Sequence, residues 1–102
     1  MKALLINKDR EILEVTLTVP TLESIQSHLK CHTITGAGSL DDNNIAWADD
    51  NGLEDHPITV VNTDWMGPLA LPILVTGTDW STGRTLATTM SVDDLKTRVV
   101  FE

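Results

Sequence analysis

The chain has 102 residues, of which 41% are hydrophobic; this composition predicts one folded domain and excludes wholesale disorder and a catalytic domain beside a regulatory one. Fifteen acidic residues against seven Lys and Arg give a formal net charge of -8, which disfavours direct binding to nucleic acid or anionic lipid. The single cysteine excludes an internal disulfide framework, and the lack of a signal peptide or a membrane-length apolar run predicts a cytoplasmic protein.

The first third of the chain predicts a hairpin followed by a helix. Residues 3–6 form a short apolar run that is typical of a buried strand. Residues 13–19 alternate apolar and polar side chains, which predicts a half-buried strand paired with the first. Thr21 is a suitable N-cap for a helix over residues 22–30. The apolar stripe of this helix consists of Leu22, Ile25 and Leu29.

The rest of the chain predicts short strands and a second helix. The strands are expected at residues 32–35, 45–48, 58–61, 73–76 and 85–90. Residues 36–39 predict a loop, the Asn-Gly pair within residues 49–52 predicts a hairpin turn, and residues 79–83 predict another turn. Ser91 and Asp94 are typical of a capping box that opens a short helix. The apolar stripe expected for that helix is Val92, Leu95 and Val99.

These elements together predict the α+β class. We expect a single domain over residues 1–102, with a mostly antiparallel, twisted sheet. The helix at residues 22–30 is too short to persist alone, so it should pack on one face of that sheet. A short C-terminal helix completes the expected fold.

Several of these segments together resemble a small bacterial and phage-encoded family defined as a domain of unknown function. The resemblance spans nearly the whole chain, and it implies a genomic setting on phages or mobile elements. It implies no activity, cofactor or catalytic residue. The segments that carry it are the opening MKALLIN (1–7), REILEV (10–15), the helix after Thr21, DDNGL (49–53), GPLALPILVTG (67–77) and SVDDL (91–95).

Candidate catalytic and metal-binding residues do not assemble into a recognised motif. Cys31 and His32 are adjacent, so on a strand they would point to opposite faces and would not pair as nucleophile and base. His28 and His32 have the spacing of two zinc ligands on one helix, with His56 or an Asp as a third ligand, but the helix is expected to end before His32. We therefore predict no enzyme activity, no metal and no cofactor.

Two loop segments are weighed as ligand sites and set aside. The Gly-Ala-Gly sequence at residues 36–38 lacks a third glycine, and it runs into two acids that would repel a phosphate. The acidic Asn-Gly segment at residues 49–52 suggests a calcium loop, but Trp47 would then occupy the first ligand position. Both segments are interpreted as turns.

The three tryptophans have two alternative interpretations. Trp65 and Trp80 each follow a Thr-Asp pair, and Trp47 lies among acidic residues. Exposed tryptophans on loops could anchor a binding partner. The favoured interpretation is that Trp65 and Trp80 fold back over the core, because small domains need the large apolar area of this side chain.

The acidic middle of the chain is the strongest functional candidate. Residues 31–83 contain no Lys or Arg, whereas the segments 1–30 and 84–102 each sum to zero charge. Such a surface attracts basic proteins, for instance by imitating DNA phosphates. Net charge alone favours the alternative interpretation, a set of solvated hairpin loops that keeps a small protein soluble. The candidate interaction residues are Asp41, Asp42, Asp49, Asp50, Glu54, Asp55, Asp64, Trp47 and Trp65.

The leading hypothesis is a non-enzymatic accessory protein of a phage or mobile element that binds a basic host protein through this acidic face. The alternative is a small-ligand-binding domain with a pocket near Trp65 and Trp80. A homodimer through an exposed sheet edge is a further expected partner arrangement.

Overall fold

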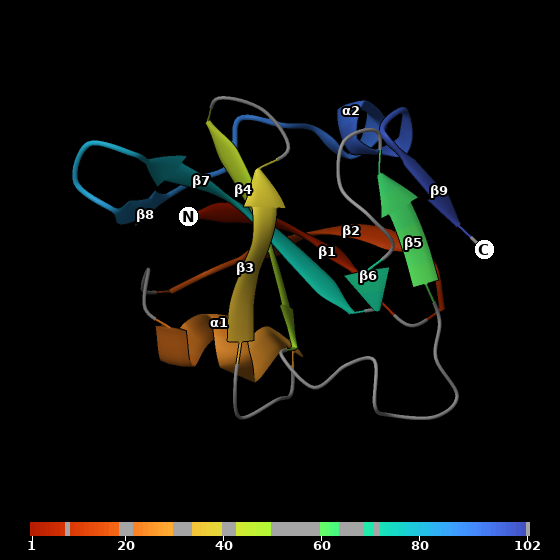
Figure 1. Ribbon diagram of the computed structural model, residues 1–102, viewed down its shortest axis with the longest axis horizontal. Helices are drawn as coiled ribbons and strands as arrows, with labels where there is room; N and C mark the ends of the chain where they lie inside the picture. The colour runs from red at the N-terminus through yellow and green to blue at the C-terminus, as the bar shows by residue number, and fades with distance from the viewer. Residues whose placement is uncertain are drawn as a thin grey trace.

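The computed structural model describes residues 1–7, 9–18, 22–29, 34–39, 43–49, 60–63, 69–70 and 72–101, which form short strands and two short helices (Figure 1). In chain order the elements are β1 (Lys2–Ile6), β2 (Ile12–Thr16), α1 (Leu22–Leu29), β3 (Ile34–Ser39), β4 (Asn44–Asp49), β5 (Val60–Thr63), β6 (Leu69–Ala70), β7 (Ile73–Asp79), β8 (Arg84–Leu86), α2 (Val92–Lys96) and β9 (Val99–Phe101).

The strands form two antiparallel sheets rather than one. The larger sheet has the order β2-β1-β7-β4-β3, and β8 also pairs with β7. The smaller sheet has the order β6-β5-β9. Figure 1 shows β7 crossing the centre of the molecule between β1 and β4. The prediction of a mostly antiparallel sheet is therefore confirmed, while the helical part of the described chain is smaller than the α+β class suggests.

Both faces of the larger sheet are covered, and this explains why β1 and the first part of β7 are continuously apolar. Along β1, Ala3 packs into one buried cluster, whereas Leu4 and Ile6 pack into another. Along β7, Leu74 joins the first cluster, whereas its neighbours join the second. Successive strand residues point to opposite faces, so a strand covered on both sides loses the apolar–polar alternation.

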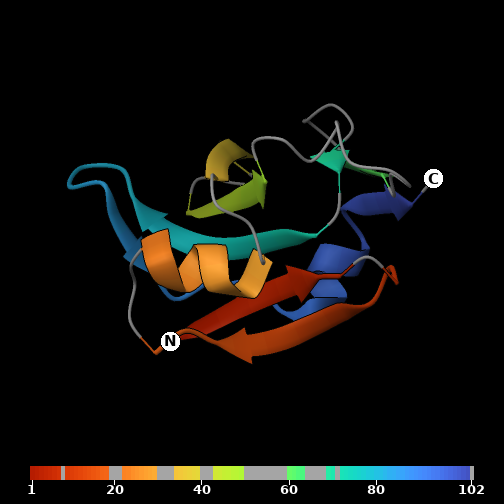
Figure 2. The ribbon, with the colours of Figure 1, turned by 90° about the horizontal axis from the view of Figure 1, so that it is seen from below.

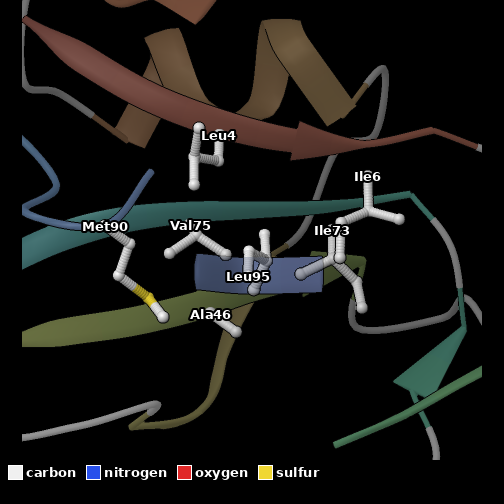
Figure 3. Packing of buried hydrophobic residues seen from close by; sticks show 7 residues of the cluster. All are labelled: Leu4, Ile6, Ala46, Ile73, Val75, Met90 and Leu95. Carbon is white, nitrogen blue, oxygen red and sulfur yellow. The ribbon is translucent and has the colours of Figure 1, made fainter. Parts of the chain in front are cut away.

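One face of the sheet is covered by the chain that leads into α2. Met90 and Leu95 are buried there against strands β1, β4 and β7 (Figure 3). Ile12, Val92 and Val99 pack around this group. The buried members of this cluster are Leu4, Ile6, Ala46, Ile73, Val75, Met90 and Leu95.

The other face is covered by α1, as Figure 2 shows. Ile25 and Leu29 are fully or almost fully buried, and they pack with Ala3, Leu17 and Leu74. This short helix lies within the residues 22–30 at which the sequence predicts one, and two positions of the expected apolar stripe are buried. Since a helix of eight residues is unstable alone, this contact with the sheet supplies its stability.

A buried asparagine ties the chain after β8 to the start of β4. The Asn44 side chain is 0% exposed. Its Oδ1 atom accepts hydrogen bonds from Thr88 Oγ1 (2.6 Å) and from the Thr89 amide (3.2 Å), and its Nδ2 atom donates to Thr89 Oγ1 (2.9 Å). Thr88 Oγ1 in turn accepts from the Met90 amide (3.2 Å). These bonds satisfy the polar groups that the fold buries at this crossing.

Gly77 allows the same crossing to approach the sheet closely. A Cβ atom at this position would overlap the Ala87 carbonyl oxygen. The Thr88 amide also donates to the Lys2 carbonyl oxygen (2.9 Å), which holds the crossing chain against β1. Glycine is therefore required at residue 77 for steric reasons.

The segment 36–39, expected to be a loop, belongs to β3. It pairs with β4, and the register shifts by one residue between Gly36 and Gly38, as in a β-bulge. Glycines are common at bulges, where they signal an irregular strand rather than a turn. The prediction of a loop at these residues is wrong because the neighbouring strand supplies hydrogen bonds that the local sequence does not reveal.

The hairpin turn expected at residues 49–52 lies outside the described residues, apart from the backbone of Asp49. Strand β4 pairs with β3 and β7, whereas the next strand, β5, belongs to the smaller sheet. Strands β4 and β5, which flank this segment, therefore do not pair with each other in the part of the chain that the structure describes.

The C-terminal prediction is correct at its start and wrong at its end. The capping box is present: Ser91 Oγ accepts from the Asp94 amide (3.1 Å), and Asp94 Oδ2 accepts from the Ser91 amide (3.2 Å). The helix ends at Lys96, and Val99 begins strand β9 instead of completing a helical stripe. The strand predicted at residues 85–90 is likewise shorter, because β8 ends at Leu86.

We expect Thr88→Val to destabilise the protein by about 1–3 kcal/mol, because it removes the hydroxyl that accepts from the Met90 amide and donates to the buried Asn44 Oδ1. Urea unfolding followed by circular dichroism measures this change. Thr16→Val makes the same chemical change at an exposed strand position, and it should stay within about 0.5 kcal/mol of the native chain. Equal effects of the two substitutions would contradict the role given to the buried network.

Candidate functional site

Most of the predicted interaction residues lie outside the described residues. These are Asp41, Asp42, Asp50, Glu54, Asp55, Asp64 and Trp65. Cys31, His32 and His56, weighed as catalytic or metal-binding residues, lie outside them too. The structure describes Trp47, and it describes the backbone of Asp49 at the end of β4.

The Trp47 side chain contributes mainly to packing and hydrogen bonding within the fold. Its indole is half-buried and packs against the cluster beneath α1. Its Nε1 atom donates a hydrogen bond to Thr76 Oγ1 (2.9 Å) on the neighbouring strand β7. A tryptophan whose N–H and part of whose ring are already bound has little left to offer a partner, so Trp47 is a poor apolar anchor.

The two acidic segments that flank β4 in the sequence join this strand at different ends. Asn43 follows Asp41 and Asp42 in the sequence and leads into β4, whereas Asp49 ends the same strand. Six residues of extended chain span about 20 Å. The acidic residues before and after β4 therefore attach at opposite ends of the strand.

The turn between β7 and β8 carries a mostly exposed tryptophan. Asp79 Oδ1 accepts hydrogen bonds from the Ser81 amide (3.0 Å) and from Ser81 Oγ (2.7 Å). The Asp79 carbonyl oxygen accepts from the Thr82 and Gly83 amides (3.3 and 2.7 Å), and Gly83 has a φ of 73°. This bonding fixes the turn around Trp80, whose side chain is 61% exposed.

The outcome for Trp80 reverses the favoured sequence interpretation. The turn led by Asp79 forms as predicted, but the indole does not fold back over the core. The turn extends beyond the other strands of the larger sheet (Figures 1 and 2). The core that would have covered the ring is already filled by residues from α1, α2 and the central strands. Trp80 is therefore a candidate binding residue, although the sequence pattern favoured a core position for it.

The hydrogen bonds of the turn also act on the ionisation of Asp79. The pKa of its carboxyl lies below the ordinary value of 3.8, chiefly because the Ser81 hydroxyl and then the Ser81 amide donate to the carboxylate. Asp79 is thus fully ionised at neutral pH. Its partner across the strand register is Arg84, so the turn presents both signs of charge beside the indole.

Strand pairing brings this turn to the end of the sheet where β4 begins. The Thr78 amide donates to the Asn43 carbonyl oxygen (2.8 Å), and Asn44 is paired with Gly77. Trp80 therefore lies two residues beyond a strand position bonded to Asn43, the residue that directly follows Asp42. We take this end of the sheet, with Asp79, Trp80 and Asn43, as the candidate site and call it the β7–β8 turn site.

The position of a strand in the larger sheet also depends on the segment of the sequence from which it comes. Strands β3, β4 and β7 all come from the segment that has no Lys or Arg, and β3 and β4 lie on one side of β7. Strands β1 and β2, from the neutral first segment, lie on the other side. The described strands of the segment without Lys or Arg thus lie on β7 and on one side of it, with Asp49 as the one acid within β3 and β4.

No helix in the described part of the chain is long and apolar enough to cross a membrane. Within the same residues, no group of three or more His, Cys, Asp or Glu side chains is placed to hold a metal ion. Comparison with protein-family models, with curated proteins and with solved structures gives no match. The resemblance to a phage-encoded family therefore stays a prediction.

We expect Ser81→Ala to raise the pKa of Asp79 back toward 3.8, because the largest stabilising bond to the carboxylate is lost. Since the folded state holds this proton less readily than the unfolded chain, the contribution to stability is present above pH 3.8 and is lost as the pH falls through the lowered pKa. Carbon-13 NMR titration of the carboxyl measures both effects. Ser81→Thr keeps the hydroxyl and should keep the low pKa, whereas equal titration of the two variants would contradict the assignment.

Proposed function

We propose that this protein is a non-catalytic accessory protein that binds a basic protein partner, with the β7–β8 turn site as part of its contact surface. The observation that carries the proposal is the 61% exposure of Trp80 on a turn held by hydrogen bonds. Tryptophan is enriched among the residues that contribute most to protein–protein binding. A turn that is already ordered also reduces the entropy lost when a partner binds.

The charge of the chain supports a basic partner. The half of the sheet next to this site derives from residues 31–83, which contain eight acids and no Lys or Arg. Such a field increases the rate of encounter with basic proteins. Asp79 and Arg84 balance each other in the turn itself, so the attraction would come from the acidic residues before β4, while Trp80 supplies the apolar contact.

This proposal changes the anchor expected from the sequence. Trp47 was one expected anchor, but its indole is bound to Thr76 and to the core. Trp80 replaces it, and Asp41 and Asp42 become the most relevant acids because they precede the residue bonded to β7. The resemblance to a phage-encoded family would make the partner a protein of the bacterial host.

An exposed indole favours a protein over a small ligand. Pockets for small molecules usually enclose about 70–90% of the ligand surface between several walls. Trp80 lies on the turn between β7 and β8, and its side chain is mostly exposed. It is therefore better placed to enter a cavity on a partner than to form the wall of a cavity in this protein.

We expect Trp80→Ala to weaken the capture of basic proteins about tenfold or more, because removing a central aromatic contact commonly costs more than about 1.4 kcal/mol. The immobilised chain is exposed to bacterial lysate at low and high salt, and bound proteins are quantified by mass spectrometry. Leu86→Ala removes a neighbouring exposed apolar side chain and should have little effect.

The charge component has its own matched pair of variants. Replacing Asp41 and Asp42 by Asn should reduce capture at low salt, and capture should fall further at a few hundred millimolar salt, where the Debye length is roughly 4–6 Å. Replacing Glu11 and Glu14 by Gln removes the same charge from the opposite sheet edge and should change capture little. Equal losses in both pairs, or capture that does not depend on Trp80, would refute this function.

A further inference from the structure

Strand β2 forms one edge of the larger sheet. Its inner side pairs with β1 over five residues, from Ile12 to Thr16, without a register shift. No other described strand pairs with its outer side, and Figure 2 shows β2 at the margin of the molecule. An open strand edge presents backbone donors and acceptors that another strand can bind.

The ladder with β1 shows which backbone groups face outward. The Leu17 amide donates to the Met1 carbonyl (2.8 Å), and the Asn7 amide donates to the Glu11 carbonyl (3.0 Å). In an antiparallel pair the hydrogen-bonded residues alternate, so the odd-numbered residues of β2 bond to β1. The residues whose amide and carbonyl groups point away from β1 are Ile12, Glu14 and Thr16.

Among the edge strands of the larger sheet, β2 is the one best suited to pair with a strand of another chain. It has no Pro, no Lys and no bulge, the usual devices that block an edge. Leu13, in its middle, is a large apolar side chain that is 43% exposed. The opposite edge, β3, has a bulge between Gly36 and Gly38, and β8 has only three residues.

We propose that β2 pairs antiparallel with β2 of a second copy of this chain, with Leu13 facing Leu13 of the second copy across a two-fold axis. In this register Ile12 is hydrogen-bonded to Glu14 of the second copy, and both outward groups of each residue are used. The register centred one residue later would place the two Glu14 carboxylates directly opposite each other, which is unfavourable. The chosen register instead covers both exposed leucines.

The distribution of charge supports a second copy at this edge. Each copy carries a net charge of -8, so two copies repel each other over most of their surfaces. Strand β2 belongs to the segment 1–30, whose charges sum to zero, and it lies across the sheet from β3 and β4. Pairing through β2 therefore joins the neutral halves and keeps the acidic halves apart.

The effect of salt distinguishes the dimer from the proposed binding of a basic partner. Added salt screens the repulsion between the two acidic copies, so the dimer should become tighter as the ionic strength rises. Binding of a basic partner should become weaker under the same conditions. The dimer does not depend on the proposed function, and each can fail without the other.

Sedimentation equilibrium of the full chain tests the dimer. We expect the mass to rise from 11.2 kDa toward twice that value with increasing concentration over roughly 10 μM to 1 mM, the range in which a small interface dissociates. Glu14→Pro removes an outward amide without touching the ladder to β1, and it should leave the chain monomeric. Glu14→Thr removes the same charge but keeps the amide, and it should still dimerise.

A second variant covers the case in which Glu14→Pro does not fold. Leu13→Lys changes an exposed side chain and would bring two like charges together on the two-fold axis. It should prevent dimerisation while its circular dichroism spectrum stays that of the native chain. A native chain that remains at 11.2 kDa throughout, or a dimer unaffected by Leu13→Lys, would overturn the inference.

Disulfide cross-linking tests the register in a chain that carries Cys31→Ser. Leu13→Cys should form a cross-linked dimer under mild oxidation, because opposed non-hydrogen-bonded residues have Cα atoms about 4.5 Å apart, within the range of a disulfide. Thr16→Cys places its two thiols about 20 Å apart in this register and should not cross-link. Equal cross-linking by both variants would overturn the proposed register.

Discussion

The fold depends on the way in which the chain crosses one face of the large sheet between β8 and α2. Asn44 makes this crossing possible, because its buried side chain hydrogen-bonds to the buried Thr88 hydroxyl and to the backbone and hydroxyl of the exposed Thr89. Gly77 provides the space for it. Without that arrangement the chain would bury unpaired polar groups, at a cost comparable to a large share of the stability of a small domain. Everything that follows residue 87, including the burial of Leu95, relies on this crossing.

The crossing chain covers only the first part of the central strand β7, so the two parts of this strand have different surroundings. The first part of β7 is covered on both faces and forms the core, whereas its last residues continue past that core and lead into the turn of Trp80. A rigid strand anchored by β1 and β4 thus positions a short, hydrogen-bonded turn at the end of the sheet. Binding residues are common on short turns supported by a rigid sheet, because the sheet fixes the position of the turn at the protein surface.

The order of strands in the larger sheet separates the neutral first segment of the chain from the middle segment, which has no Lys or Arg. The neutral first segment supplies one edge, and the acidic middle supplies the other. The two proposals use these two edges differently: the acidic side attracts a basic protein, and the neutral side meets a second copy. A dimer formed in this way would carry two β7–β8 turn sites, and two linked sites bind a multivalent partner more tightly than one site does.

Local sequence patterns determined the elements whose stabilising contacts lie close together in the chain. The first strand, the helix with Ile25, the capping box of Ser91 and the turn at Asp79 follow from such patterns, because their hydrogen bonds or apolar stripes span only a few residues. Tertiary structure alone decided the strand through Gly36, the role of Val99 and the exposure of Trp80. Each of those depends on a partner far along the chain, since pairing and burial are set by whichever strands and side chains already occupy the sheet.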